Sequence, residues 1–215
     1  MTSNTGTRNI ILFPLVLHEF MIPDFDADEI VKYCYNERTI DPEGKHKSNR
    51  GGWQSQDHYS RFDNILSRTL LKGLNLWSES DIFEKGAQME VTAMWINMNG
   101  KKDYNMKHNH PNADLSGVFW VQGAGPKKGS LVFDDANNFS RFQESVCYTE
   151  NFKNEYMLWD QFVFEPKVGQ CVIFPASLDH NVEFNETDEE RISVSFNIVL
   201  DIDFNSATIG RAINK

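Results

Sequence analysis

Three histidines of this chain are spaced in a way that could hold one metal ion. His108 and His110 stand at i and i+2, and His180 follows seventy residues after His110. Side chains of residues i and i+2 on an extended strand point to the same side, so the first pair could bind one metal ion from the end of a strand. Three ligands on one face of an octahedral ion leave three positions open, which is typical of non-haem Fe(II) oxygen chemistry. A closed structural zinc site would require a fourth ligand.

The three other histidines stand in less informative surroundings. His18 adjoins an expected strand, and His46 and His58 lie in a polar stretch. We expect each of them to be a surface or capping residue rather than a ligand. His180 differs because it comes between two expected strands, and ligands at the ends of neighbouring strands are a normal way to build a metal site in a β-barrel.

A polar stripe is expected on the last strand. Through residues 191–198 polar side chains alternate with apolar ones: Arg191, Ser193, Ser195 and Asn197 against Ile192, Val194, Phe196 and Ile198. Alternation of this kind predicts a strand with two unlike faces. The polar face lies either in water or inside a barrel, and one arginine with three small polar residues suits a polar cavity.

Two helices and a series of short strands must position these residues. The apolar residues 10–17 are interpreted as a buried strand, and the acids that follow predict a helix up to about Thr39. Helical spacing predicts a second helix over 62–77. Short strands are expected at 91–96, 117–121, 130–133, 156–159, 161–164, 170–174 and 181–184, separated by turn signals. The stretch 137–155 could be a lid or a surface excursion.

This order of elements predicts a mainly β fold with flanking helices. Many short strands after two helices are typical of a double-sheet jelly roll. With 215 residues, 40% of them hydrophobic, the chain can form one sizeable domain. We expect a single domain over 1–215, in which 10–80 form an N-terminal strand and buttressing helices and 87–203 form the jelly-roll core.

Charge and cysteine usage restrict the partners and the compartment. A net charge of −10 argues against nucleic acid as the main partner, because such binders usually need a basic face. The widely spaced Cys34, Cys147 and Cys171 form neither a disulfide framework nor a zinc pattern, which favours a reducing cytoplasm. The apolar residues 10–17 are too few to span a membrane.

A cluster of lysines precedes and follows the histidine pair. This cluster could attract an anionic substrate or be an ordinary solvated surface: Lys101, Lys102, Lys107, Lys127 and Lys128.

Taken together, the motifs resemble a known family. They are SNRGGWQS (48–55), NMNG (97–100), YNMKHNHP (104–111), LSGV (115–118), GQCVIFP (169–175), HNV (180–182) and RISVSFN (191–197). In combination they are similar to the 2-oxoglutarate/Fe(II)-dependent oxygenases found in phages and marine bacteria, over roughly residues 10–200. The resemblance implies a double-stranded β-helix (a cupin-like jelly roll), with Fe(II) and 2-oxoglutarate as cofactors. It also implies a dioxygenase that hydroxylates a small molecule or a protein side chain and releases succinate and CO2.

The resemblance assigns the metal ligands residue by residue. His108 matches the first iron ligand of the superfamily and His180 the distal one. His110 falls where the superfamily usually has Asp or Glu, so the iron site would be one charge more positive. Asp114 is the alternative third ligand, and Asp179 could orient an imidazole from behind.

The resemblance also assigns the residues that bind the oxo-acid. Arg191, eleven residues after His180, matches the basic residue that binds the 5-carboxylate of 2-oxoglutarate, with Ser193 as its partner. Arginine suits this role because its planar fork meets a carboxylate with two parallel hydrogen bonds. Asn97, eleven residues before His108, resembles an asparagine that contacts the oxo-acid in related oxygenases.

Two other functions fit the same residues. One is a three-histidine, cupin-type dioxygenase that chelates its substrate directly and needs no oxo-acid. The other is a non-catalytic jelly-roll binding module. The compartment would be the cytoplasm, or the host cytoplasm if the protein is viral, and the oligomeric state stays open. Tyr104 could contact the oxo-acid or pack on its strand, and Trp95 and Trp120 are expected in the core.

Overall fold

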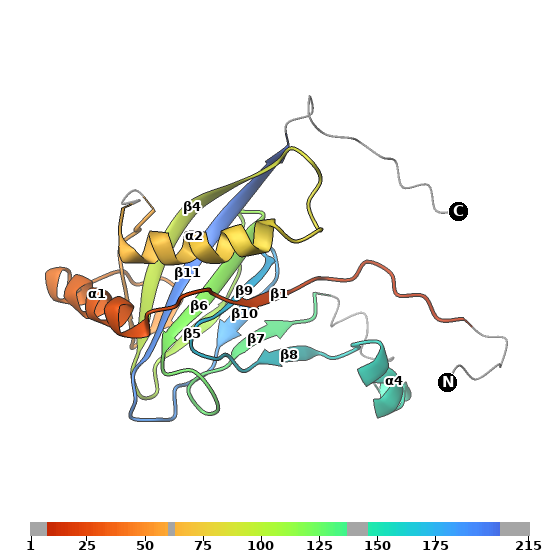
Figure 1. Cartoon of the computed structure of the whole chain (residues 1–215). Helices are drawn as coiled ribbons and strands as arrows, with labels where there is room; N and C mark the ends of the chain where they lie inside the picture. The colour runs from red at the N-terminus through yellow and green to blue at the C-terminus, as the bar shows by residue number, and fades with distance from the viewer. Residues whose placement is uncertain (1–7, 60–62, 137–145, 203–215) are drawn as a thin grey trace.

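The computed structural model describes residues 8–59, 63–136 and 146–202. Two antiparallel β-sheets form its centre, and helices α1 and α2 pack outside the larger sheet (Figure 1). The predicted jelly roll is confirmed.

The larger sheet has six strands and the smaller sheet has five. In spatial order the larger contains β1 (His18–Met21), β9 (Gln170–Pro175), β6 (Leu115–Gln122), β11 (Arg191–Ile202), β4 (Ala87–Asn99) and β3 (Trp53–Gln54). The smaller contains β2 (Asn49–Arg50), β5 (Tyr104–His108), β10 (His180–Val182), β7 (Leu131–Asp134) and β8 (Gln161–Phe164).

Both expected helices form, and a capping side chain precedes each of them. Helix α1 (Ala27–Ile40) begins after Asp26, whose carboxylate accepts a hydrogen bond from the backbone N–H of Glu29. Helix α2 (Ile65–Ser78) begins after Asn64, whose side chain accepts from the backbone N–H of Ser67. A short helix, α4 (Glu150–Glu155), is capped by Thr149.

Strand β11 separates two different environments. Four of its apolar side chains have no exposed surface: Ile192, Val194, Phe196 and Ile198. They share a core cluster with side chains of both long helices, among them Ile30, Leu66, Leu70 and Trp77. On the neighbouring strand, a Cβ at Gly117 would meet the ring of Phe196 at 2.2 Å, so the close contact requires glycine. The other face of β11 looks into the space between the sheets.

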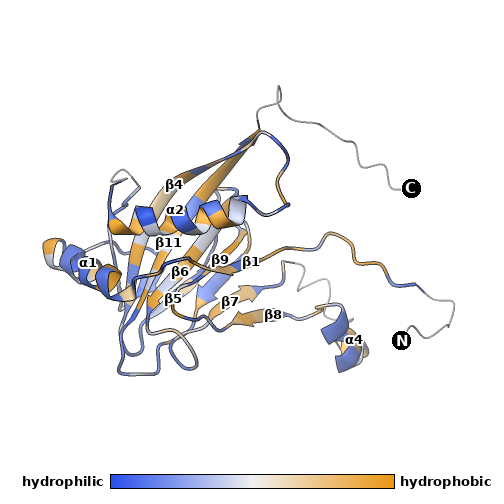
Figure 2. Cartoon of the chain, in the orientation of Figure 1, coloured by the Kyte–Doolittle hydropathy of each residue, from blue (hydrophilic) through white to orange (hydrophobic). Residues whose placement is uncertain are grey.

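The expectation of a buried strand over residues 10–17 is wrong. This segment, here called the arm, has no strand, and the first strand begins only at His18. Figure 2 shows the arm as a hydrophobic segment that runs away from the sheets. Pro14 lacks an N–H for pairing, and Phe13 before it has a left-handed φ of 56° and is 93% exposed.

The strand expected at 156–159 is also wrong. Tyr156 ends helix α4 as its C-cap, and Met157 has a positive φ of 53°. The aromatic residues instead make local contacts, with the rings of Phe152 and Tyr156 4.6 Å apart. Residues 137–145 of the expected lid or excursion lie outside the described residues, and the described remainder contains α4.

In the part of the chain that the structure describes, no helix is long and apolar enough to cross a membrane.

Candidate metal centre and oxo-acid cavity

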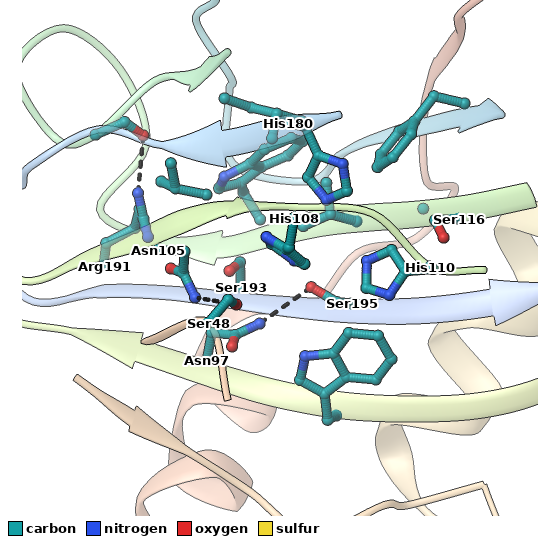
Figure 3. A pocket seen from close by; sticks show the side chains of 18 residues that line it. Ser48, Asn97, Asn105, His108, His110, Ser116, His180, Arg191, Ser193 and Ser195 are labelled. Atoms are coloured by element: carbon teal, nitrogen blue, oxygen red, sulfur yellow. Dashed lines mark hydrogen bonds between the residues drawn. The ribbon is translucent and has the colours of Figure 1, made fainter. Parts of the chain in front are cut away.

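The three histidines predicted as ligands meet at one end of the space between the sheets. His108 ends β5 and His180 begins β10, and the two are directly opposite each other in the ladder. His110 follows two residues after β5. One nitrogen from each ring can be chosen so that all three lie within 4.8 Å of one another. Figure 3 shows the three rings turned toward one another.

Backbone carbonyls orient two of the imidazoles. Nδ1 of His108 lies 2.7 Å from the carbonyl oxygen of Met106, and Nδ1 of His180 lies 2.9 Å from that of Leu178. A carbonyl oxygen only accepts, so each Nδ1 carries the proton and each Nε2 keeps a lone pair for a metal. His110 is held differently: its backbone N–H donates to Ala176 at 2.8 Å, and its ring lies 5.6 Å from that of Trp95.

Burial keeps the three imidazoles neutral. Desolvation, together with the neighbouring His180 and His108, lowers the pKa of His110 to about 3. The pKa of His180 falls to about 4, mainly through burial, while the Leu178 carbonyl and Asp179 oppose the shift. Burial also lowers the pKa of His108. Neutral imidazoles are the form that binds metal, so the cluster is ready to bind at pH 7.

A cavity runs from the histidines to Arg191. In Figure 3, His110 lies at one end and Arg191 at the other, with polar side chains of β4 and β11 between them. The polar face of β11 therefore lines a cavity rather than facing water. The polar residues around this cavity are Ser48, Asn97, Asn105, Ser116, Ser193 and Ser195.

Arg191 is a buried cation with an unused donor. It is 1% exposed, and its Nη1 donates to the Gly129 carbonyl at 2.8 Å. Its Nε is buried without a hydrogen-bond partner, and the described residues place no carboxylate in an ion pair with it. Burial lowers the pKa of its guanidinium to about 10, although the negative charge of Asp103 raises it in part. Arg191 therefore stays charged at pH 7. Buried charges are normally paired, so this arrangement suits an anionic ligand.

Asn97 and Ser193 lie beside this arginine. The two are directly opposite each other in the β4–β11 ladder, and both are buried. Asn97 Nδ2 donates to Ser195 Oγ at 3.0 Å, and its Oδ1 is buried without a partner. The residues predicted for the oxo-acid thus share one cavity with the residues predicted for the metal.

Neither of the two carboxylates considered near the metal is part of the histidine cluster. Asp114 accepts a hydrogen bond from the backbone N–H of Leu200 at 2.8 Å and is not part of the histidine cluster. Asp179 accepts from Asn109 Nδ2 at 2.7 Å.

The structure decides several expectations about aromatic and histidine side chains. Trp95, expected in the core, is only half-buried and lines the cavity next to His110. Trp120 lies in the core as expected, in the apolar cluster between the sheets, and also lines the cavity. Tyr104 packs against Phe184 at 4.5 Å and lines a separate outer groove. The surface role expected for His58 is wrong, because it is 1% exposed, with Nδ1 3.2 Å from the Tyr33 hydroxyl.

Sequence reasoning did not single out Ser48, Asn105 and Ser116 as cavity residues. Asn105 Nδ2 donates to Ser48 Oγ at 3.3 Å across the β2–β5 pair. Nothing in the sequence signals that pairing. Trp95 could have been found, because it stands two residues before Asn97 on the same face of β4.

Acidic partners neutralise most of the lysine cluster. Lys101 pairs with Asp188 at 2.8 Å and Lys107 with Asp134 at 2.7 Å. Lys128 pairs with Glu189. The solvated-surface interpretation is therefore the better one for these lysines.

Comparison with known families agrees with this geometry. Residues 93–197, which include all six predicted site residues, match a family described as "Putative 2OG-Fe(II) oxygenase". This part of the chain is therefore similar to the 2-oxoglutarate/Fe(II) oxygenase family. The predicted family and its two cofactors are thereby confirmed, while an origin in phages or marine bacteria stays a prediction. No curated protein matches the chain.

Solved oxygenases share the fold at low identity. The alpha-ketoglutarate-dependent epimerase SnoN from nogalamycin biosynthesis is 13% identical with a TM-score of 0.55, covering 91% of this chain and 88% of its own. HygX from Streptomyces hygroscopicus, solved with nickel and 2-oxoglutarate, is 10% identical with a TM-score of 0.56, covering 85% and 82%. A Pseudomonas putida prolyl-4-hydroxylase is 13% identical with a TM-score of 0.51, covering 85% and 91%.

The residues present fit the family's two cofactors. Three neutral imidazoles converge as metal ligands must. At the far end, Nε of Arg191 and Oδ1 of Asn97 are buried without partners, as expected where a polar ligand completes the hydrogen bonding.

Proposed function

We propose that this oxygenase is a dioxygenase that hydroxylates its substrate and converts 2-oxoglutarate to succinate and CO2. The observation that carries the proposal is the shared cavity, with three neutral histidines at one end and a buried, incompletely paired arginine at the other. His108, His110 and His180 would hold Fe(II). When bound, iron and the oxo-acid would supply the chemistry that splits O2, with one oxygen atom going into succinate and the other into a C–H bond of the substrate.

Arg191 would hold the 5-carboxylate of the oxo-acid. Its Nη1 is fixed by the Gly129 carbonyl, which leaves Nε and the remaining donors for the ligand. The Ser193 hydroxyl, two residues further along the same strand face, would donate a second hydrogen bond. Asn97 would use its amide to hold the oxo-acid nearer the metal. A buried fork of donors favours a dicarboxylate because paired, charge-assisted hydrogen bonds are strong.

The substrate would approach from the end opposite Arg191. Trp95, His110 and Ser116 line that end. The aromatic rings of Trp120 and Phe174 close the cavity wall and exclude water from the reacting groups. The substrate would be a small molecule or a protein side chain; solved proteins of this fold include a prolyl-4-hydroxylase and enzymes of nogalamycin biosynthesis.

Succinate release tests the proposal. Purified protein with Fe(II) and ascorbate should slowly convert 2-oxoglutarate even without substrate, and millimolar 2-oxoglutarate should raise the melting temperature. Arg191→Ala should lose both effects, while His108→Ala should lose turnover through loss of metal.

Each alternative predicts a different result. Turnover of a directly chelated substrate that is indifferent to Arg191→Ala would favour the three-histidine dioxygenase. Absence of metal binding in the folded wild-type protein would favour the non-catalytic module. Either result would contradict the proposed function.

A further inference from the structure

One side-chain hydrogen bond joins the segments that carry the three histidines. The β5–β10 ladder reaches His108 opposite His180. At this point Asn109 Nδ2 donates to Asp179 Oδ1 at 2.7 Å, across seventy residues of sequence. Asn109 stands between His108 and His110, and Asp179 directly precedes His180. The bond therefore ties all three ligand positions together.

Asp179 is also the carboxylate held next to the ligand positions. It directly precedes His180 and accepts a hydrogen bond from the residue between His108 and His110. Asp114, the other nearby acid, is bound to a backbone N–H of β11. Within the described residues, the cluster itself contains no carboxylate.

We propose that Asp179 supplies the metal site, from outside its ligand set, with the negative charge that three neutral imidazoles lack, and that Asn109 fixes that carboxylate in place. The inference rests on the proposed metal role of the three histidines. Both residues are positioning residues, because neither is a member of the ligand cluster.

The size of the effect follows from where the pair lies. Partners behind metal ligands typically change metal affinity by roughly 10–100-fold when mutated. Asp179 and Asn109 are both exposed, so we expect the low end of that range. An exposed charge is also screened, with a Debye length of roughly 10 Å at 0.1 M salt and 3 Å at 1 M. The charge contribution should therefore shrink in salt, whereas a packing contribution should not.

Two substitutions separate charge from hydrogen bonding. Asp179→Asn keeps a side-chain oxygen that can accept from Asn109 but removes the charge. Asn109→Ala keeps the charge but removes the bond that fixes it. Asp81→Asn, in the exposed turn after α2 and outside the cavity lining, makes the same change in net charge as a control.

The measurement is a Co2+ titration of the apoprotein, followed by visible absorbance in low salt and in about 1 M salt. We expect Asp179→Asn to weaken Co2+ binding roughly tenfold in low salt, with a smaller loss for Asn109→Ala and none for Asp81→Asn. The loss for Asp179→Asn should shrink in high salt. The Fe(III)/Fe(II) potential of Asp179→Asn should be more positive, because the lost charge stabilises the ferric ion more.

An unchanged affinity in Asp179→Asn, or a loss that is equal at both salt concentrations, would overturn the inference. The proposed function would survive that result, since wild-type metal binding and succinate release would be intact. Failure of the wild-type protein to bind Co2+ would instead contradict the proposed function itself.

Discussion

Around Arg191 and Ser193, the two faces of β11 are both buried but chemically opposite. One face presents Phe196 and its apolar neighbours to the helices, with no exposed surface. The other presents Arg191, which is 1% exposed, and Ser193 to the cavity. Burial alone therefore does not distinguish core from site in this molecule. The distinction lies in the side chains of β11 itself, because the cavity face includes Nε of Arg191, a buried polar atom without a partner, whereas the helix-facing side chains such as Phe196 carry no polar atoms.

The largest expected effect is on the helix side. Phe196→Ala should lower the free energy of unfolding by about 3–5 kcal/mol, because it removes a buried ring and leaves a cavity against Gly117. Urea denaturation measures the loss. The Co2+ affinity of the protein that remains folded should be close to wild type. If Phe196→Ala weakened Co2+ binding as well as stability, the two faces of β11 would not act independently.

On the cavity side the opposite outcome is expected. Arg191→Met should weaken 2-oxoglutarate binding by roughly 100-fold, the usual scale for removing one partner of a buried charge pair. The unfolding free energy of the apoprotein should stay the same or rise, because a buried cation with an unpaired Nε is replaced by an apolar chain. Calorimetry of binding and denaturation of the same variant check both parts; a strongly destabilised apoprotein would show that Arg191 is structural.

A smaller effect is expected at Gly129, the glycine next to the guanidinium of Arg191. A Cβ at Gly129 would lie 2.3 Å from Arg191 Nη1, and its φ of +88° disfavours other residues. Gly129→Ala should displace the guanidinium and weaken 2-oxoglutarate binding by roughly tenfold, a loss of about 1.4 kcal/mol. Gly125→Ala is the matched control. Its φ of +114° also disfavours other residues, but a Cβ added there would have no neighbouring atom within 4 Å. Equal losses in both variants would assign the effect to backbone strain.

The last expected effect is that of pH on the stability of the apoprotein. His110 and His180 have folded pKa values of about 3 and about 4, below the ordinary 6.5. As pH falls below 6.5 the unfolded chain takes up protons that the folded chain does not, so stability falls, by at most about 1.4 kcal/mol per pH unit for each group. Denaturation at pH 7, 6 and 5 should show this slope, and His110→Gln should flatten it.

Local patterns predicted much of this fold. Both long helices follow their caps, and the alternation in 191–198 correctly gave one apolar and one polar face. Two of the wrong predictions concern segments whose secondary structure depends on contacts with other parts of the fold. The arm has strand-like composition but no partner strand, and residues 156–159 continue from a helix end into a turn.

The site was predictable where residues share one strand, and less so elsewhere. Arg191 and Ser193 stand on one strand face, so alternation brings them together. Ser48 reaches the cavity only through the pairing of β2 with β5, which no local pattern encodes. His58 is buried because it lies next to Tyr33 of α1, a tertiary contact outside the reach of local sequence.

Pro14 has a consequence for how the arm behaves in a concentrated solution. The arm leads into β1, which is an edge strand of the larger sheet, and edges with apolar extensions are templates for unwanted pairing between molecules. The proline removes one N–H in the middle of the segment, and the left-handed Phe13 breaks the alternation of its faces. Neither half is then long enough to form the six- or seven-residue zipper from which amyloid grows. The residue that prevented the expected strand thus also protects the chain against aggregation.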